Sequence, residues 1–306
     1  MRFIGGRASR PSIDRSSVFV FNAIVETRRP TMPYSRCQGQ QDAAIHSSTT
    51  GETPVPQLMS VREIMPETRR PLIAVATYNE IENLPRLIDK IVRAVPHADL
   101  LVIDDNSPDG TGAWCDEKCA ADSRVNCLHR AGKLGLGTAI VAGMKYAIEH
   151  GYERLVNLDA DFSHDPFAIP KLLAAIDTSD GPPADVAIGS RYIAGGRIEG
   201  WPLRRHVMSR AVNRYSRLVL KLPVKDCSGS FRCYRVARLA ELDLDGITSR
   251  GYSFFEEILW RLARRGSRMV EVPITFVERK YGRSKINIRE AISAIGTITK
   301  LGLRRP

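Results

Sequence analysis

The sequence predicts an α/β fold in which a mostly parallel sheet is covered by helices on both faces. From about residue 70 onward, continuous apolar runs alternate with amphipathic segments. Such runs are typical of strands buried on both faces, and their alternation with helices is typical of parallel βαβ units. Three runs lead directly into polar clusters, TYNE, DDNSPDG and DADFSHD. Because ligands bind at the carboxyl ends of parallel strands, we expect these clusters to meet in one site.

The first strand–helix–strand unit lies at residues 71–105. PLIAVATY (71–78) is a continuous apolar run and is interpreted as a strand. A helix is expected next, because apolar residues recur there at spacings of three and four. These residues are Leu84, Leu87, Ile88, Ile91 and Val95. DLLVIDD (99–105) is the second strand, and NSPDGTG (106–112) is a turn rich in Pro and Gly.

The same alternation continues to about residue 192. We expect a helix after the turn, a short strand at 125–129, and a helix from about 138 to 149 that Gly151 ends. YERLVNLDAD (152–161) and ADVAIGSRY (184–192) are interpreted as further strands. The chain of 306 residues is long enough for one large α/β domain.

Composition indicates an anionic partner. The formal net charge is +11 and the pI is near 9.6, which suits nucleic acid, an acidic membrane surface or phosphorylated small molecules. The six cysteines form no CxxC pair, and Cys115 and Cys119 are interpreted as packing residues of a helix. We therefore expect free thiols in a reducing compartment.

The two ends of the chain differ from its middle. Residues 1–67 contain eight arginines and no lysine, with little hydrophobic periodicity, so we expect a flexible extension or an over-long start. The apolar run VFVFNAIV (18–25) is shorter than the roughly 18 residues of a membrane span. The predicted division is an extension at 1–67, a domain at 68–288 and a basic amphipathic tail at 289–306.

The DAD motif is the strongest candidate metal site. Asp159 and Asp161 are one residue apart at the end of a predicted buried strand, so an extended chain places both carboxylates on one side. Two such carboxylates suit Mg²⁺ or Mn²⁺ held together with water and substrate phosphates. Asp165 precedes Pro166 and is expected to cap a helix.

The other two polar clusters suit a nucleotide. Tyr78 could lie against a base, and Glu80 could accept a ribose hydroxyl or only favour a helix N-terminus. Asp105 could accept hydrogen bonds from a guanine or uracil edge. Asp109 could be only an Asx-turn residue.

The glycine-rich stretch GKLGLGTAI (132–140) does not indicate a dinucleotide site. The G-x-G-x-x-G fingerprint fails because position 140 is Ile, and the stretch does not open the first strand–helix unit. No Walker A sequence is present either. We expect the glycines to let the backbone pass close to a substrate, with Lys133 reaching a phosphate.

Several basic residues in Gly-containing loops are candidate phosphate clamps. They are Arg191, Arg204, Arg205, Arg279 and Lys285.

The ordered motifs resemble one enzyme family. TYNEIENL, IDDNSPDGTG, GKLGLGTA, LDADFSHDP, IGSRY, GWPLRR, SGSFRCYR, RGYSF, EVPITFVER and YGRSK occur in that order over residues 77–285. Together they resemble the dolichyl-phosphate (polyprenyl-phosphate) mannose synthases of the inverting glycosyltransferase family 2. The resemblance implies a GT-A fold, the Rossmann-like fold of nucleotide-diphospho-sugar transferases, over about residues 71–288.

The resemblance also implies roles for individual residues. The positions matching the guanosine site are Ala76, Tyr78, Glu80, Ile103 and Asp105. The positions matching the metal and nucleotide-phosphate site are Asp159, Ala160, Asp161 and Ser163, with Asp159, Asp161 and Ser163 as metal ligands. Arg191, Arg279 and Lys285 match positions that hold the donor diphosphate and sugar. Arg205 matches a position that grips the acceptor phosphate, and the expected catalytic set is Asp161, Arg205, Arg279 and Lys285.

Two positions depart from the family pattern. Ala76 stands where many members have Pro, but only a main-chain contact is expected there. Ser163 stands where some members have Gln, and Ser is a weaker neutral ligand, so water could complete the Mg²⁺ or Mn²⁺ shell.

The implied reaction transfers mannose from GDP-mannose to a dolichyl or polyprenyl phosphate. The acceptor oxygen is already anionic, so no strong general base is needed, and in-line attack gives a β-linked product. Glu256 and Glu257 lie where relatives using hydroxyl acceptors place a base; here one could orient a cation or face solvent.

A lipid acceptor requires contact with a membrane. Leu203–Leu222 shows an apolar stripe (Val207, Ala211, Tyr215, Leu218, Leu222) and a basic one (Arg210, Arg214, Arg217, Lys221), the pattern of an interfacial helix. The tail, with Ile288, Ile292 and Ile295, could be a second such helix. We expect peripheral binding at the cytoplasmic face of a membrane, directly or through a small membrane-anchoring subunit.

Three alternatives remain open from the sequence. The same fold could move glucose or N-acetylglucosamine from a UDP-sugar to a polyprenyl phosphate, or a sugar to a hydroxyl acceptor. A basic nucleic-acid-binding protein fits the net charge, but the acidic strand ends would repel a phosphate backbone. We therefore expect no nucleic-acid partner. An inactive binding module is disfavoured by the intact DAD motif, Arg279 and Lys285.

Overall fold

The structure is a computed structural model that describes residues 70–177, 181–249, 251, 253–278 and 288–303, the last segment with side chains from residue 294 onward. The chain divides into two units, Met1–Ser35 and Arg36–Pro306, and every described residue belongs to the second. The predictions made for residues 1–67, for Arg279 and for Lys285 lie outside the described residues.

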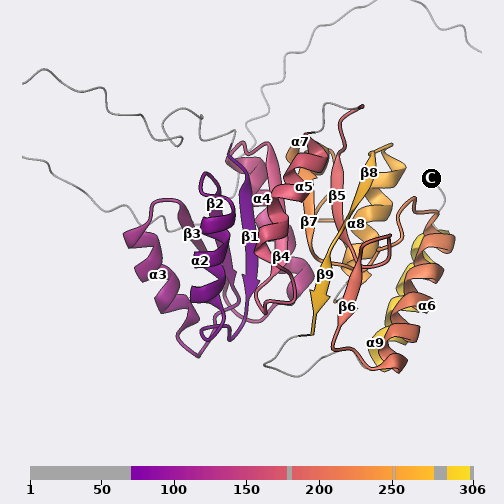
Figure 1. Ribbon diagram of the computed structural model, residues 1–306, viewed down its shortest axis with the longest axis horizontal. Coiled ribbons are helices and arrows are strands. Elements are labelled where there is room, and N and C mark those ends of the chain that lie inside the picture. Colours follow the sequence, from indigo (N-terminus) through magenta and orange to yellow (C-terminus); the bar gives the residue numbers. More distant parts are fainter. Residues whose placement is uncertain (1–69, 178–180, 250, 252, 279–287, 304–306) are drawn as a thin grey trace, which may run out of the picture. The chain divides into compact units, whose positions relative to one another are not determined.

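A seven-stranded sheet with the order β3-β2-β1-β4-β7-β5-β8 forms the centre of the fold (Figure 1). The strands are β1 (Leu72–Thr77), β2 (Asp99–Asp104), β3 (Val125–His129), β4 (Arg154–Asp159), β5 (Val186–Ser190), β7 (Arg232–Arg235) and β8 (Met269–Pro273). All neighbouring strands pair in parallel except β7, which is antiparallel to β4 and β5. The predicted mostly parallel sheet is therefore confirmed.

Helices cover both faces of this sheet. They are α2 (Leu84–Ala94), α3 (Thr111–Ala121), α4 (Leu136–Glu149), the 3₁₀ turn η2 (Pro166–Ala168), α5 (Ile169–Ile176), α6 (Leu203–Leu220), α7 (Val236–Ala240), α8 (Ser253–Arg264) and α9 (Ile288–Leu303). One core cluster joins the sheet to α2, α3 and α5, and the other joins it to α4, α7, α8 and α9.

The alternation of side chains along β1 explains why both faces need cover. Ile73 and Val75 belong to the first cluster, whereas Leu72 and Ala74 belong to the second. Successive residues of a strand point to opposite faces, so a continuous apolar run supplies both cores at once.

The strand register brings the polar clusters together. Thr77 pairs with Asp104 across β1 and β2, and Ala76 pairs with Asp159 across β1 and β4. The three central strands therefore end at one edge of the sheet, and the residues that follow them must emerge side by side. The predicted convergence of the clusters is confirmed.

A smaller substructure closes this edge of the domain. β6 (Arg197–Glu199) pairs in parallel with β9 (Thr275–Val277), and α6 lies beside α9 (Figure 1). Three residues of α9, Ala294, Ile298 and Leu301, are buried in the core shared with α4 and α8. The described part of the predicted tail is thus packed on the domain.

No helix in the described part of the chain is long and apolar enough to cross a membrane.

Candidate functional site

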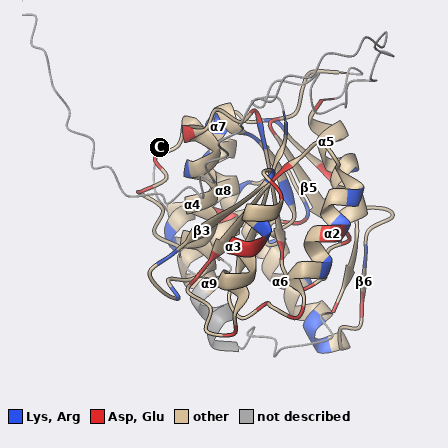
Figure 2. Ribbon diagram, turned by 90° about the vertical axis from the view of Figure 1, so that its left-hand side faces the viewer, with Lys and Arg blue, Asp and Glu red and all other residues tan. Residues whose placement is uncertain are grey.

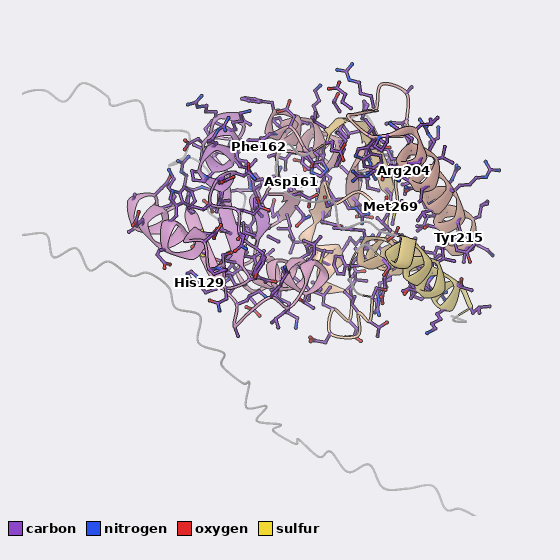
Figure 3. All side chains as sticks on the ribbon, turned by 90° about the horizontal axis from the view of Figure 1, so that it is seen from below. His129, Asp161, Phe162, Arg204, Tyr215 and Met269 are labelled. Atoms are coloured by element: carbon purple, nitrogen blue, oxygen red, sulfur yellow. The ribbon has the colours of Figure 1, made fainter. Side chains whose placement is uncertain are left out.

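A cavity of about 430 Å³ lies where the three strand ends meet. Polar and charged side chains that line it include Thr77, Tyr78, Glu80, Asp105, Lys133, Asp159, Asp161 and Arg191. Apolar side chains of α4, α6, α8 and α9 also line it, among them Leu136, Ala139, Met208, Val212, Phe255 and Ala294. Figure 3 looks onto this edge of the sheet, with Asp161 above its centre. Such a site suits a ligand that has a charged part and an apolar part.

The two carboxylates of the DAD motif both line the cavity, but not as the sequence predicted. β4 ends at Asp159, and the chain then turns, with Phe162 at a φ of 59°. The premise of an extended strand through Asp161 is therefore wrong. The Ser230 hydroxyl lies 2.7 Å from Asp159 Oδ2, and the Ser163 N–H donates to Asp161 Oδ1 at 3.0 Å. These bonds, rather than strand alternation, orient the pair.

His164 lies directly behind these carboxylates. It is 2% exposed and stands between the rings of Phe231 and Phe276, with Nδ1 3.9 Å from Asp159 Oδ2. Burial lowers the pKa of His164, although the charges of Asp159 and Asp161 oppose that shift. A neutral imidazole carries no positive charge, so His164 does not balance the negative charge of Asp159 and Asp161.

These residues fit a hard divalent cation. Among the described residues, no cluster of three His, Cys, Asp or Glu side chains could form a complete cage. Mg²⁺ is commonly bound by only one or two carboxylates together with substrate phosphates. Asp159 and Asp161 meet that requirement, and the buried hydroxyl of Ser163 lies beside them.

Asp105 anchors the glycine-rich loop. Its Oδ1 accepts from Arg130 Nη1 at 2.7 Å, and its Oδ2 accepts from the N–H groups of Leu134 and Gly135 at 3.1 and 3.3 Å. Gly135 has a φ of 99°, which favours glycine, and it lines the cavity. The carboxylate of Asp105 can accept one further hydrogen bond. Its recognition of the edge of a nucleotide base therefore stays a prediction.

The neighbouring acidic residues of the DDNSPDG cluster are structural. Asp104 accepts from the hydroxyl groups of Thr77 and Ser107 at 3.0 and 2.6 Å. Asp109 accepts from the backbone N–H of Thr111 at 3.0 Å and from that of Ile81 at 3.1 Å. The Asx-turn interpretation of Asp109 is confirmed.

Two residues that follow β1, Tyr78 and Glu80, also line the cavity. The Lys133 ammonium lies 3.8 Å from the centroid of the Tyr78 ring. Glu80 Oε2 accepts from Asn83 at 2.9 Å, and its carboxylate borders the cavity. Ala76 lines the cavity, whereas Ile103 is buried in the core between β2 and α4.

Arg191 is held by a carboxylate that sequence reasoning missed. Its guanidinium donates to both oxygens of Asp226 at 2.7 Å, and the Asp226 side chain is fully buried. Burial opposes charge on both groups, yet their attraction raises the pKa of Arg191 and lowers the pKa of Asp226. The pair therefore stays charged. Asp226 lies far from Arg191 in sequence and carries no local signal.

Arg205 and Arg204 have different environments. Arg205 lies 4.0 Å over the Trp201 ring, pairs with Glu278 and lines the cavity. Arg204 is exposed on α6 and is absent from the cavity wall (Figure 3). Of these two predicted phosphate-binding residues, Arg205 therefore remains a candidate and Arg204 does not.

The two glutamates of α8 are both buried, so the interpretation that one faces solvent is wrong. Glu257 is 0% exposed and pairs with Arg261, as expected for a residue that orients a cation. Glu256 is 1% exposed and lines the cavity. Desolvation raises the pKa of Glu256 to about 8.

Comparisons with known proteins agree with this geometry. The model of glycosyl transferase family 2 matches residues 72–242. The chain is 46% identical over 234 residues to an undecaprenyl-phosphate mannosyltransferase of Micrococcus luteus, covering 76% of this chain and 94% of that protein. It is also 46% identical over 229 residues to a polyprenol monophosphomannose synthase of Mycolicibacterium smegmatis, covering 74% of this chain and 85% of that protein.

Solved structures show the same fold at lower identity. A glucosyl-3-phosphoglycerate synthase from Mycobacterium tuberculosis, solved with Mn²⁺, UDP and phosphoglyceric acid, has a TM-score of 0.54 and 18% identity, covering 78% of this chain and 80% of that one. Its complex with Mg²⁺ and UDP has a TM-score of 0.55 at the same 18% identity, covering 76% and 80%. This likeness supports the predicted GT-A architecture.

Proposed function

Because the chain belongs to glycosyl transferase family 2, we propose that it transfers mannose from GDP-mannose to a polyprenyl phosphate, such as dolichyl phosphate, with inversion to the β-anomer. Two relatives that share 46% identity over most of the chain carry names for mannosyl transfer to this class of lipid. The observation that carries the proposal is one cavity lined both by the carboxylates Asp159 and Asp161 and by apolar side chains of the helices.

In this proposal, Asp159, Asp161 and Ser163 hold Mg²⁺ or Mn²⁺. When bound, such an ion offsets the negative charge that develops on the departing nucleotide diphosphate. Ser230 and the Ser163 N–H keep the two carboxylates oriented toward the cavity. The neutral His164 behind them excludes water from one side of Asp159.

The donor nucleotide is placed where the strand ends line the cavity. Tyr78 and Glu80, which follow β1, border the space for the guanosine, with Ala76 and Asp105 beside it, whereas Ile103 is buried in the core and does not line the cavity. Lys133 supplies positive charge in this cavity. We assign Arg191, whose charge is paired with Asp226, to the donor diphosphate and sugar together with Arg279 and Lys285, from their match to the family pattern. Ala160 supplies only main-chain contact. Positioning and charge stabilisation carry the reaction, as in other transfers of phosphate-linked groups.

The acceptor phosphate is placed against Arg205. Arg205 lines the cavity on α6, and its position over Trp201 fixes the guanidinium. A lipid phosphate is anionic at neutral pH, so it can attack the anomeric carbon without prior loss of a proton. When this oxygen attacks the anomeric carbon from the side opposite the leaving diphosphate, the configuration of that carbon is inverted.

The exposed face of α6 suits an acidic membrane surface. Leu203, Val207 and Leu218 are 78%, 60% and 67% exposed, and Arg210, Arg214 and Arg217 are exposed on the same helix. Figure 2 shows the basic residues along the ribbon. The predicted apolar stripe needs two corrections. Leu222 follows the helix and is buried, and the Tyr215 hydroxyl lies 2.7 Å from the Thr299 hydroxyl of α9 (Figure 3). We propose peripheral binding at the cytoplasmic face, directly or with a small anchoring subunit.

Calorimetric titration tests the donor assignment. The purified chain is titrated with GDP-mannose, UDP-glucose and UDP-N-acetylglucosamine, each with and without Mn²⁺. We expect GDP-mannose to bind more tightly than either UDP-sugar, and only with the metal present. Tighter binding of a UDP-sugar would overturn GDP-mannose as the donor and move the enzyme to the related UDP-sugar reaction.

A further inference from the structure

The mechanism above leaves one buried acidic side chain of the cavity without a role. Glu256 lies in the first turn of α8, and α8 packs against α9, which in turn packs against α6. All three helices contribute residues to the cavity lining, and Glu256 is the acidic residue that α8 contributes.

One carboxyl oxygen of Glu256 has no hydrogen-bond partner among the described residues. The residue is 1% exposed and this oxygen, Oε2, is buried, whereas the backbone N–H of Glu256 itself interacts with its carboxyl group. A buried polar atom without a partner is costly, so such atoms are uncommon unless a ligand or water completes them. Because the side chain lines the cavity, a ligand there can supply the missing partner.

The charged groups that act on Glu256 do not neutralise it. Arg232 is fully buried and donates to the carbonyl oxygens of Phe255 and Cys227 at 2.9 and 2.7 Å. Arg191 is paired with Asp226, whose own charge disfavours ionisation of Glu256. Desolvation outweighs the attraction of both arginines and raises the pKa of Glu256 to about 8. The side chain is therefore a neutral acid at neutral pH.

We propose that Glu256 binds the acceptor as a neutral carboxylic acid, donating its proton in a hydrogen bond to an oxygen of the acceptor phosphate. This inference rests on the proposed function. A neutral acid is the one acidic group that can lie beside a phosphate without repelling it, and it keeps a donor for the anionic oxygen. The proposed function assigns the donor diphosphate to Asp159 and Asp161 and the acceptor phosphate to Arg205 of α6. Because α6 and α8 both pack against α9 and line the same cavity, we assign the acceptor phosphate as the partner of Glu256.

The assignment gives Glu256 a role opposite to that of a general base. A protonated carboxyl cannot accept a proton, and the phosphate does not need to lose one. When Glu256 ionises, the hydrogen bond is lost and two negative charges face each other. Acceptor affinity must then fall at alkaline pH, whereas donor affinity does not.

The test measures the acceptor KM from pH 7 to pH 9.5 with the full chain, GDP-mannose and a short polyprenyl phosphate in detergent. Wild type is compared with Glu256→Gln, which keeps an N–H donor and cannot ionise. The matched control is Glu257→Gln, because Glu257 is equally buried but bonds Ser249 and Arg261. Binding of the same acceptor without donor is followed by tryptophan fluorescence, since Trp201 lines the cavity.

We expect the wild-type acceptor KM to rise about tenfold per pH unit above about pH 8, because acceptor binding then requires Glu256 to take up one proton. Glu256→Gln should bind the acceptor a few-fold more weakly at pH 7 and lose the alkaline rise. Glu257→Gln should keep the rise, and the donor KM should stay flat in all three proteins. The phosphate itself loses its second proton near pH 6, below this window.

Three outcomes would overturn the inference. The first is an equal alkaline rise of the acceptor KM in wild type and Glu256→Gln. The second is a donor KM that rises in parallel with the acceptor KM. The third is a large loss of kcat in Glu256→Gln at unchanged acceptor KM, which would indicate a general base. A wild type that binds the acceptor with the expected pH dependence but transfers no mannose would refute the proposed function and support the inference. Absence of acceptor binding would overturn both.

Discussion

The guanidinium of Arg205 lies 2.6 Å from the carboxylate of Glu278 and 4.0 Å over the Trp201 ring. Both charged groups line the cavity, and Glu278 is the more exposed of the two. The group that we assign to the acceptor phosphate is thus already oriented by a carboxylate. A phosphate that binds there must share or replace that carboxylate.

Replacing Arg205 by Ala should raise the acceptor KM by about tenfold to a hundredfold, as expected for loss of a charge-assisted hydrogen bond of about 1.5–3 kcal/mol. The donor KM should change little. Steady-state kinetics with each substrate varied in turn provides the measurement. The control is Arg204→Ala on the same helix turn, where the side chain is exposed outside the cavity. Equal effects of the two changes would remove Arg205 from the acceptor site.

Replacing Asp161 by Ala should lower transfer by at least about a hundredfold, the loss typical of a removed electrostatic stabiliser. The residual rate should no longer respond to Mg²⁺ or Mn²⁺, and the circular dichroism spectrum should be unchanged. The control is Asp165→Asn, which alters an exposed carboxylate that caps η2 four residues away. Near-full, metal-stimulated activity of Asp161→Ala would show that the metal assignment is wrong.

Replacing Asp226 by Ala should destabilise the fold by about 3–5 kcal/mol, because it leaves the buried guanidinium of Arg191 without its partner. Urea denaturation gives the free energy of unfolding. The comparison is Asp245→Ala, which breaks the ion pair with Lys145 at the surface, where Asp245 is 84% exposed. That change should cost less than about 1 kcal/mol. Similar losses in both variants would contradict the structural role of Asp226.

The pH dependence of stability should differ between wild type and Glu256→Gln. Desolvation raises the pKa of Glu256 from 4.5 to about 8 on folding. Between these values the unfolded chain has lost a proton that the folded chain retains. Wild type should therefore lose stability relative to the variant as pH rises, by up to about 1.4 kcal/mol per pH unit. Below about pH 4.5 and above about pH 8, the difference in the free energy of unfolding between the two proteins should be constant. Urea denaturation at a series of pH values provides the measurement. If the two free energies change in parallel with pH throughout, Glu256 is solvated in the folded protein.

Charge reversal on α6 should weaken binding to anionic vesicles. The variant changes Arg210, Arg214 and Arg217 to Glu, and each basic residue near such a surface contributes about 1 kcal/mol. Vesicle sedimentation should show the loss, while transfer to a short acceptor in detergent should persist. The control reverses three exposed basic residues outside α6, Arg93, Lys171 and Arg265. Loss of activity on the detergent-dispersed acceptor as well would move the α6 arginines into the reaction site.

The strands and the meeting of their ends were predictable because local patterns encode them. The run PLIAVATY became β1 with alternate residues in two cores, and the DAD and TYNE motifs emerged at one edge, as expected. Boundaries were less predictable. β4 ends at Asp159, and the chain turns at Phe162. There Asp161 accepts from the Ser163 N–H and Asp159 accepts from the Ser230 hydroxyl, and the hydrophobic pattern of the sequence does not predict these bonds.

The partners of the charged residues were not predictable from the sequence. Asp226 and Glu278 pair with arginines more than thirty residues away, and such pairings depend on tertiary packing alone. Glu256 and Glu257 are neighbours in one helix turn, yet one pairs with Arg261 and the other borders the cavity. Only the packed helix decides which of two adjacent carboxylates becomes a neutral acid.

The most direct test of the account is transfer itself. The purified chain is incubated with a polyprenyl phosphate, Mg²⁺ and either GDP-mannose or a UDP-sugar, and the lipid product is analysed by mass spectrometry and by NMR of its anomeric carbon. The account predicts a β-linked mannosyl phosphate from GDP-mannose and no comparable product from UDP-glucose or UDP-N-acetylglucosamine. A glucosyl or N-acetylglucosaminyl lipid, an α-linked product, or no lipid product at all would contradict it.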